Sequence, residues 1–274
     1  MGRHGPDYAL CRYGLSRMSF RGPERSLDGR YIAFLGGTET FGKFLDQPFP
    51  DLVEEALSEV CVNFGAVNAG VDLYMRDATV LAAAHDALAT VVQVPGVQNQ
   101  SNRFYTVHPR RNDRFIRQTA ALETLYPDVD FADVVFTRHL LLALAQRCEE
   151  RFRIVRCELQ DNWVRRMTAL LAQIAGPKVL LWFAETPPEL STAGQDVMHA
   201  DPLFVTRDMV EEVLCKSLDA TLLTVVPNPA SGARRREGLN FHPMERPAAE
   251  AMLGVAAHEA AAHALVGALG PILK

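Results

Sequence analysis

The chain has 274 residues, 48% hydrophobic and 22% charged, so it can bury the core of one globular domain with an appendage. Its net charge of −5 and pI near 5.9 argue against a general nucleic-acid-binding surface. The five scattered cysteines form no CxxC pair, and no stretch has the apolar length of a membrane span or a signal-peptide core. We therefore expect a cytoplasmic protein without a disulfide framework, metal, cofactor, membrane span or nucleic-acid partner.

The first 28 residues are rich in Gly, Arg and Pro and show no periodic pattern, which predicts an arm on the surface of a domain spanning 29–274. That domain opens with an apolar run, Tyr31–Leu35, which stops at paired glycines. Such a run is typical of a buried parallel strand, and residues 41–57 read mostly as a helix. Thr38 would then stand at the carboxyl end of the strand, where open α/β sheets bind ligands.

The same pattern of an apolar run, a turn of small or amide residues and a helical segment repeats along the chain. Further strands are predicted at 61–64, 89–95, 178–184 and 220–226, and helices at 73–88, 157–175, 207–218 and 248–269. Strands that alternate with helices predict an α/β fold of three layers, α/β/α, around a five-stranded, mainly parallel sheet with right-handed crossovers.

Residues 100–150 differ from the repeating pattern and predict a helical, arginine-rich insertion, with helices at 115–126 and 136–151. Arginines at 103, 110, 111 and 114 alternate with aromatic residues directly after the third predicted strand. Guanidinium groups bind phosphate, sulfate or carboxylate in a bidentate manner, so this segment could bind an anionic group of a ligand. The alternative is a solvated loop whose arginines pair with Asp113 and Asp128.

Three strand-end turns carry a family resemblance. Gly36–Gly42 is similar to the block Gly-Asp-Ser-x-Thr-x-Gly, Asn68-Ala69-Gly70 to a second block that ends in glycine, and Gly96–Asn99 to a third, Gly-x-Asn-Asp. In these motifs the chain resembles the SGNH or GDSL hydrolase superfamily, whose architecture is flavodoxin-like. It is also similar to a group of alphaproteobacterial proteins from which no activity carries over.

The resemblance implies an ester hydrolase or acyl-group transferase acting on a carbohydrate or another polar acyl ester. Thr38 would replace the nucleophilic serine, although the methyl group of threonine crowds attack. The implied oxyanion donors are Gly70 with Gln98 or Asn99. The small-molecule or glycan substrate would contact Gly37, Glu39, Asn68, Arg103, Arg110 and Arg111.

The catalytic base is where the sequence departs from the family. No Asp-x-x-His occurs near the carboxyl terminus, and Met252 falls roughly where the histidine belongs. His242 or His258 could substitute, and His242 is favoured because it lies in a loop before the last predicted helix. His258 and His263 lie five residues apart inside that helix and should face different sides.

Two other functions remain open. The chain could be a non-catalytic descendant of the superfamily that keeps the pocket for ligand binding. The turn at 37–43 also resembles the start of a nucleotide-binding P-loop, which would suggest phosphoryl or sulfuryl transfer, although Phe44 stands where Ser or Thr must hold magnesium.

Overall fold

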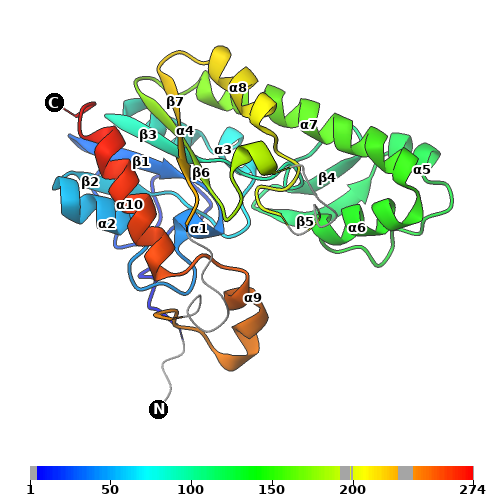
Figure 1. The fold of residues 1–274 in the computed structure, drawn as a ribbon, viewed down its shortest axis with the longest axis horizontal. Helices are drawn as coiled ribbons and strands as arrows, with labels where there is room; N and C mark the ends of the chain where they lie inside the picture. The colour runs from blue at the N-terminus through cyan, green and yellow to red at the C-terminus, as the bar shows by residue number, and fades with distance from the viewer. Residues whose placement is uncertain (1–4, 192–197, 199, 228–236, 274) are drawn as a thin grey trace.

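A parallel five-stranded sheet forms the centre of the protein (Figure 1). The structure is a computed structural model and describes residues 5–191, 198, 200–227 and 237–273. The strand order is β2-β1-β3-β6-β7, and all four neighbouring pairs are parallel, which confirms the predicted α/β fold. The strands are β1 Tyr31–Leu35, β2 Val60–Asn63, β3 Ala89–Gln93, β6 Lys178–Phe183 and β7 Ala220–Val225.

Helices cover both faces of this sheet, because the side chains of each strand alternate between two apolar clusters. In β1, Tyr31, Ala33 and Leu35 face one cluster and Ile32 and Phe34 the other. The larger cluster includes residues of α3 Val71–Met75, α4 Ala78–Asp86, α7 Glu149–Leu171 and α8 Arg207–Cys215. The smaller one includes residues of α2 Phe49–Leu57 and α10 Val255–Leu269.

Several predicted helices are interrupted, and in each case a local feature accounts for the break. The segment 41–57 divides into α1, Thr38–Phe41, and α2, because Gly42 adopts a left-handed conformation at φ 72°. Asp77 separates α3 from α4 by capping α4 through the Val80 N–H. The tail helix divides into α9, Arg246–Glu250, and α10, with residues 251–254 between them.

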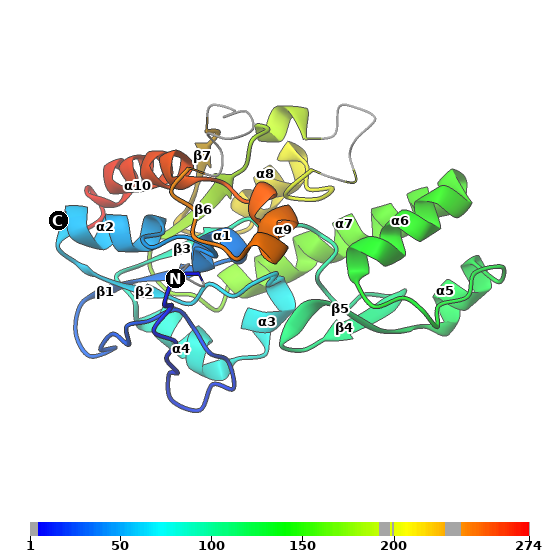
Figure 2. The ribbon, with the colours of Figure 1, turned by 90° about the horizontal axis from the view of Figure 1, so that it is seen from below.

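The insertion contains a separate two-stranded antiparallel sheet, where a helix beginning at residue 115 was predicted. Val107 pairs with Phe115 and Tyr105 with Gln118 across the two strands, so the helical prediction was wrong for residues 115–118. Figures 1 and 2 show the insertion beside the main sheet, with α7 running toward it. Its elements are β4 Tyr105–His108, β5 Arg111–Gln118, α5 Ala120–Leu125 and α6 Thr137–Arg147.

The helix predicted at 157–175 begins earlier, at Glu149, and the helix predicted at 136–151 ends at Arg147. Cys148 lies between α6 and α7 in an extended conformation. In the described part of the chain no single helix is both long and apolar enough to cross a membrane. One pair of segments, Pro243–Glu250 and Val255–Leu269, has the length and composition of a membrane span when the two are taken together. The segments are bent by 44° at the break between them.

The described part of the amino-terminal arm supports the turn that follows β1. Arg21 is 5% exposed, and its guanidinium donates to the carbonyl oxygens of Gly42 (2.9 Å) and Leu45 (2.9 Å). The same group lies 5.3 Å from the centre of the Tyr8 ring. The arm thus binds the backbone that leads from α1 to α2.

Candidate active site

A cavity of about 810 Å³ opens at the carboxyl ends of the parallel strands. It lies where the strand order reverses between β1 and β3, which is where sheets of this topology bind ligands. The turns that follow β1, β2 and β3 converge there. From these turns, Gly37, Thr38, Glu39, Asn68, Gln98 and Asn99 line the cavity.

The Thr38 hydroxyl is held by one residue, Asn68. It donates to the Asn68 Oδ1 (3.2 Å) and accepts the Asn68 backbone N–H (2.9 Å). The Asn68 Nδ2 in turn donates to a carboxylate oxygen of Asp113 (3.1 Å). Within the described ranges, no histidine or carboxylate bonds the Thr38 hydroxyl.

Amide side chains tie the turns around the cavity together. The Asn99 Nδ2 donates to the Asn68 carbonyl (3.0 Å), and its Oδ1 accepts the Thr137 hydroxyl (2.8 Å). Both ends of the Asn99 carboxamide are therefore bound within the protein. Asn99 connects the second turn to α6 of the insertion, and this connection uses one of the two hydrogens of its Nδ2.

Gln93, the last residue of β3, occupies the amino-terminal end of α1. Its Oε1 accepts the backbone N–H groups of Gly37 (3.1 Å) and Thr40 (3.2 Å) and the Thr40 hydroxyl (2.6 Å). These are amides that a phosphate-binding loop would need for its ligand. Lys43 lies over the Phe44 ring, 4.5 Å from its centre, so neither these amides nor this lysine is arranged as in a P-loop.

Gly70 does not line the cavity. Its N–H donates to the Oδ1 of the fully buried Asn112 (3.0 Å), so the predicted oxyanion role does not fit this arrangement. A Cβ added to Gly70 would lie 1.8 Å from the Asn99 carbonyl oxygen. Glycine is therefore required here because two backbone segments approach closely.

Gln98 retains hydrogen-bonding capacity toward a ligand. It lines the cavity, is 7% exposed, and its buried Oε1 has no hydrogen-bond partner among the residues that the structure describes. An unpaired buried acceptor costs stability, which a ligand donor or a water molecule would restore. Because an oxyanion needs a donor and Oε1 is an acceptor, the oxyanion role predicted for Gln98 would fall to its Nε2 group.

His258 is a buried structural residue. Its Nδ1 accepts the Phe49 backbone N–H (3.2 Å), so its Nε2 carries the hydrogen and donates to the Glu39 carboxylate (3.1 Å). The ring is stacked on Phe49 and meets the edge of Phe183, and it is fully buried. The proposed base role was wrong for His258, because both nitrogens are bound within the protein.

Glu39 lines the cavity, as predicted, but its carboxylate is already engaged. The second oxygen, Oε1, accepts the Leu253 backbone N–H (3.0 Å). Glu39 therefore links α1 to the start of α10, through Leu253 and His258 together. This pair of bonds holds residues 251–253 against the cavity, which they line.

Residues 251–253 form an apolar wall at the position where the resemblance to SGNH hydrolases implies a catalytic base. Met252 lines the cavity at the position aligned with the histidine. The position three residues earlier, which would hold the aspartate, is the fully buried Ala249. His242 does not line the cavity, and its Nδ1 accepts the Met244 N–H (3.3 Å) at the start of the 3₁₀ helix η4, Pro243–Glu245.

The charged residues of the cavity lining are mainly acidic. Arginines 103, 110 and 111 do not line it, so their predicted contact with the substrate does not fit this cavity. Among the described lining residues, the arginine is Arg138 on α6, which donates to Asp201 (2.8 Å) and to the Met198 carbonyl (2.8 Å). The described lining contains the carboxylates Glu39, Asp113, Glu185, Asp201 and Glu250 and the cations Lys43 and Arg138.

Sequence reasoning missed Gln93, Asn112, Arg138 and Asp201. Gln93 ends the observed strand β3, whereas the predicted strand continued to residue 95, so Gln93 was not recognised as a strand-end residue. The other three come from the insertion and from a late loop, where no pattern marked them. In the described part of the chain, no cluster of three or more His, Cys, Asp or Glu side chains is arranged to hold a metal ion.

Residues 1–273 match the protein family described as Domain of unknown function (DUF6473). The chain belongs to the DUF6473 family. No curated protein matches this DUF6473 chain. Its fold has low similarity to several solved hydrolase structures.

One such structure is a carbohydrate esterase family 2 enzyme with a carbohydrate-binding domain from Corynascus thermopiles (Myceliophthora fergusii). It has 15% identity and a TM-score of 0.46, over 92% of this chain and 69% of the other. A lipase, Lip_vut3, from a goat rumen metagenome has 10% identity and a TM-score of 0.45, over 88% and 97%. A further carbohydrate esterase has 10% identity and a TM-score of 0.43, over 93% and 68%. At these scores the likenesses carry no inference about the activity of the DUF6473 chain.

Proposed function

We propose that the chain is a ligand-binding protein that takes a hydroxyl-rich molecule, such as a glycan, into the 810 Å³ cavity and does not hydrolyse it. The observation that carries this proposal is the hydrogen bonding of the Thr38 hydroxyl. Asn68 both donates to it and accepts from it, so its surroundings are those of a bound polar group rather than an activated nucleophile.

The absence of an activating base among the described residues argues against turnover. A threonine hydroxyl needs a base to become nucleophilic, and general-base assistance typically supplies roughly 10²- to 10⁴-fold in rate. His258 is bound on both ring nitrogens, and Met252 presents a thioether where a base would be needed. The same hydroxyl can still exchange its Asn68 bond for one to a ligand.

The described lining offers hydroxyl, carboxamide and carboxylate groups that can form hydrogen bonds with a ligand. Gln98 supplies a carboxamide with an unpaired acceptor, and Phe136, which is 42% exposed, supplies an aromatic surface. Ligand sites commonly combine such aromatic surface with a few polar groups that fix orientation. A sugar ring fits this combination, since it presents hydroxyl groups and apolar C–H faces.

The second candidate is an ester hydrolase or acyl-group transferase with Thr38 as nucleophile. The convergence of the first three strand-end turns on one cavity favours it, because the resemblance to SGNH hydrolases implies that arrangement. It requires that the Thr38 hydroxyl leave Asn68 and donate its proton to a base. No described residue acts as that base in this structure.

One experiment separates the two candidates. Purified protein is titrated calorimetrically with neutral and amino oligosaccharides and, in parallel, treated with a fluorophosphonate probe and short acyl esters. We expect binding without labelling or hydrolysis. Thr38→Val removes the hydroxyl while keeping the volume and should weaken binding by roughly tenfold. Thr124→Val, on α5 outside the cavity, is the matched control and should bind normally.

Covalent labelling of Thr38 with multiple-turnover hydrolysis would establish the second candidate instead. If the folded protein binds none of the sugars, or if Thr38→Val binds as well as the wild type, the cavity does not have the proposed role.

A further inference from the structure

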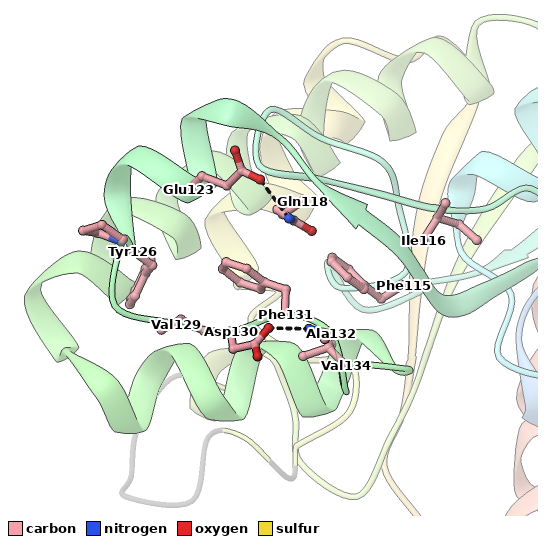
Figure 3. Close-up of a pocket in the computed structure, with 11 residues that line it drawn as sticks. Phe115, Ile116, Gln118, Glu123, Tyr126, Val129, Asp130, Phe131, Ala132 and Val134 are labelled. Atoms are coloured by element: carbon pink, nitrogen blue, oxygen red, sulfur yellow. Dashed lines mark hydrogen bonds between the residues drawn. The ribbon is translucent and has the colours of Figure 1, made fainter.

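A second cavity of about 500 Å³ lies in the insertion, between β5, α5 and the loop that precedes α6 (Figure 3). It is distinct from the first cavity, because two paired segments separate them. The Phe115 N–H donates to the Val135 carbonyl (3.0 Å), and Arg114 pairs with Phe136 in an antiparallel bridge. Asp113 and Phe136 line the first cavity, whereas Phe115 and Val134 line the second.

Aromatic rings make up much of the apolar wall of the second cavity. Phe115 and Phe131 are 9% and 8% exposed and present their edges to it, with the fully buried Tyr126 behind. The Tyr126 hydroxyl donates to the Leu144 carbonyl (3.1 Å), away from any ligand, so the cavity meets the ring rather than the polar group.

The charged groups of this lining are acidic only. Glu123 and Asp130 belong to it, and its described residues include no Lys, Arg or His. Glu123 accepts from the Gln118 side chain (2.8 Å) and Asp130 from the Ala132 N–H (2.9 Å), but a carboxylate has about four acceptor positions, so both keep capacity for a ligand. No cation of the lining neutralises these carboxylates.

One neighbouring cation is already engaged. The Arg151 guanidinium lies 4.4 Å from the centre of the Tyr126 ring, but it donates to Asp128 (2.7 Å) and does not line the cavity.

We propose that this second cavity binds an organic ammonium ion with an aryl or branched alkyl body. The apolar body would pack against Phe115 and Phe131, and the ammonium group would lie beside one of the two carboxylates, Glu123 or Asp130, which stand on opposite sides of Phe131 (Figure 3). A carboxylate stabilises such a cation by a charge-assisted hydrogen bond, whereas an anion would meet negative charge that no cation of the lining offsets. This inference does not depend on the function proposed for the first cavity.

The test compares 2-phenylethylammonium with 2-phenylethanol, which has the same ring but no charge. Binding to the whole protein is followed by ligand-observed NMR and calorimetry. A ligand of this size should bind with a Kd of roughly 1 to 10 mM. We expect the alcohol to bind at least about fivefold more weakly, because it loses the attraction to a carboxylate about 4 Å away.

Two pairs of variants locate the site. Ala132→Trp places a bulky ring in the lining and should abolish binding, whereas Ala120→Trp, exposed on α5 outside the lining, should bind normally. Glu123→Gln and Asp130→Asn keep their size and an acceptor oxygen, and one of the two should weaken binding of the ammonium ion but not of the alcohol; if neither does, the proposal is overturned.

The proposal is overturned if the ammonium compound does not bind in this range, if Ala132→Trp binds as the wild type does, or if the alcohol binds equally well. Preference for 2-phenylacetate over the ammonium compound would also overturn it. Circular dichroism of each variant confirms that a lost signal does not reflect unfolding.

Discussion

Replacing Gly70 by alanine tests whether this residue shapes the site by close packing or acts as an oxyanion donor. The added Cβ would lie 1.8 Å from the Asn99 carbonyl oxygen and 2.7 Å from its carbon, so one of the two turns must move. The Gly70 φ of −112° suits any residue, and therefore the cost comes from contact rather than from backbone conformation.

The expected magnitude follows from what the movement disrupts. The bonds from the Gly70 N–H to Asn112 and from the Asn99 side chain to the Asn68 carbonyl are both at risk, and each contributes about 1 kcal/mol. Overpacking adds roughly 1–3 kcal/mol. We therefore expect a loss of about 3–5 kcal/mol in the free energy of unfolding, measured by urea denaturation with an unchanged m-value.

Gly267→Ala is the matched control for this substitution. Gly267 is exposed in the interior of α10, and an added Cβ would meet nothing within 4 Å. The same chemical change should stabilise the protein there by up to about 1 kcal/mol, because alanine favours the helix. If Gly70→Ala costs less than about 1 kcal/mol, the close-packing explanation is incorrect.

Three further predictions concern the site and its surroundings. Thr38→Ser combined with Met252→His restores the nucleophile and base of the SGNH pattern and should produce esterase activity above either single variant, by roughly 10²-fold; a folded but inactive double variant would argue against the alignment. His258→Phe keeps an aromatic ring but leaves the Glu39 carboxylate with one hydrogen-bond partner fewer. It should lower the free energy of unfolding, measured by urea denaturation, by roughly 2–4 kcal/mol. An unchanged free energy would show that His258 does not have the structural role described above. Burial raises the pKa of Asp51 from 3.8 to about 6, so the native state binds more protons than the unfolded state between these values. Stability should therefore fall as pH rises from about 4 to about 6, by roughly 1–3 kcal/mol after allowing for solvent screening, and Asp51→Asn should flatten that slope in melts at each pH.

The strand pattern was readable from the sequence because buried parallel strands are apolar without interruption. Tyr31–Leu35 and Lys178–Phe183 lie in the sheet close to where their composition placed them. Glycine and amide residues after the strands likewise indicated which turns meet at the ligand-binding edge. Both features depend on short stretches of chain, so the sequence alone determined the fold class and the place of the cavity.

Helix boundaries and the conformation of the insertion depended on contacts that the sequence does not show. The strand around Phe115 forms because it pairs with β4 and with the segment at 135–136, and the tail helix breaks where Leu253 bonds to Glu39. Such partners are distant along the chain, and local propensity is too weak to override them.

The roles of the site residues were decided by tertiary structure alone. His258 looked like a possible base, yet it bonds to Glu39, 219 residues away along the chain, and to the backbone of Phe49. Thr38 looked like a nucleophile, yet its hydroxyl is held by Asn68. A residue type specifies which hydrogen bonds a side chain can form, whereas its neighbours in space determine which of them remain for a substrate.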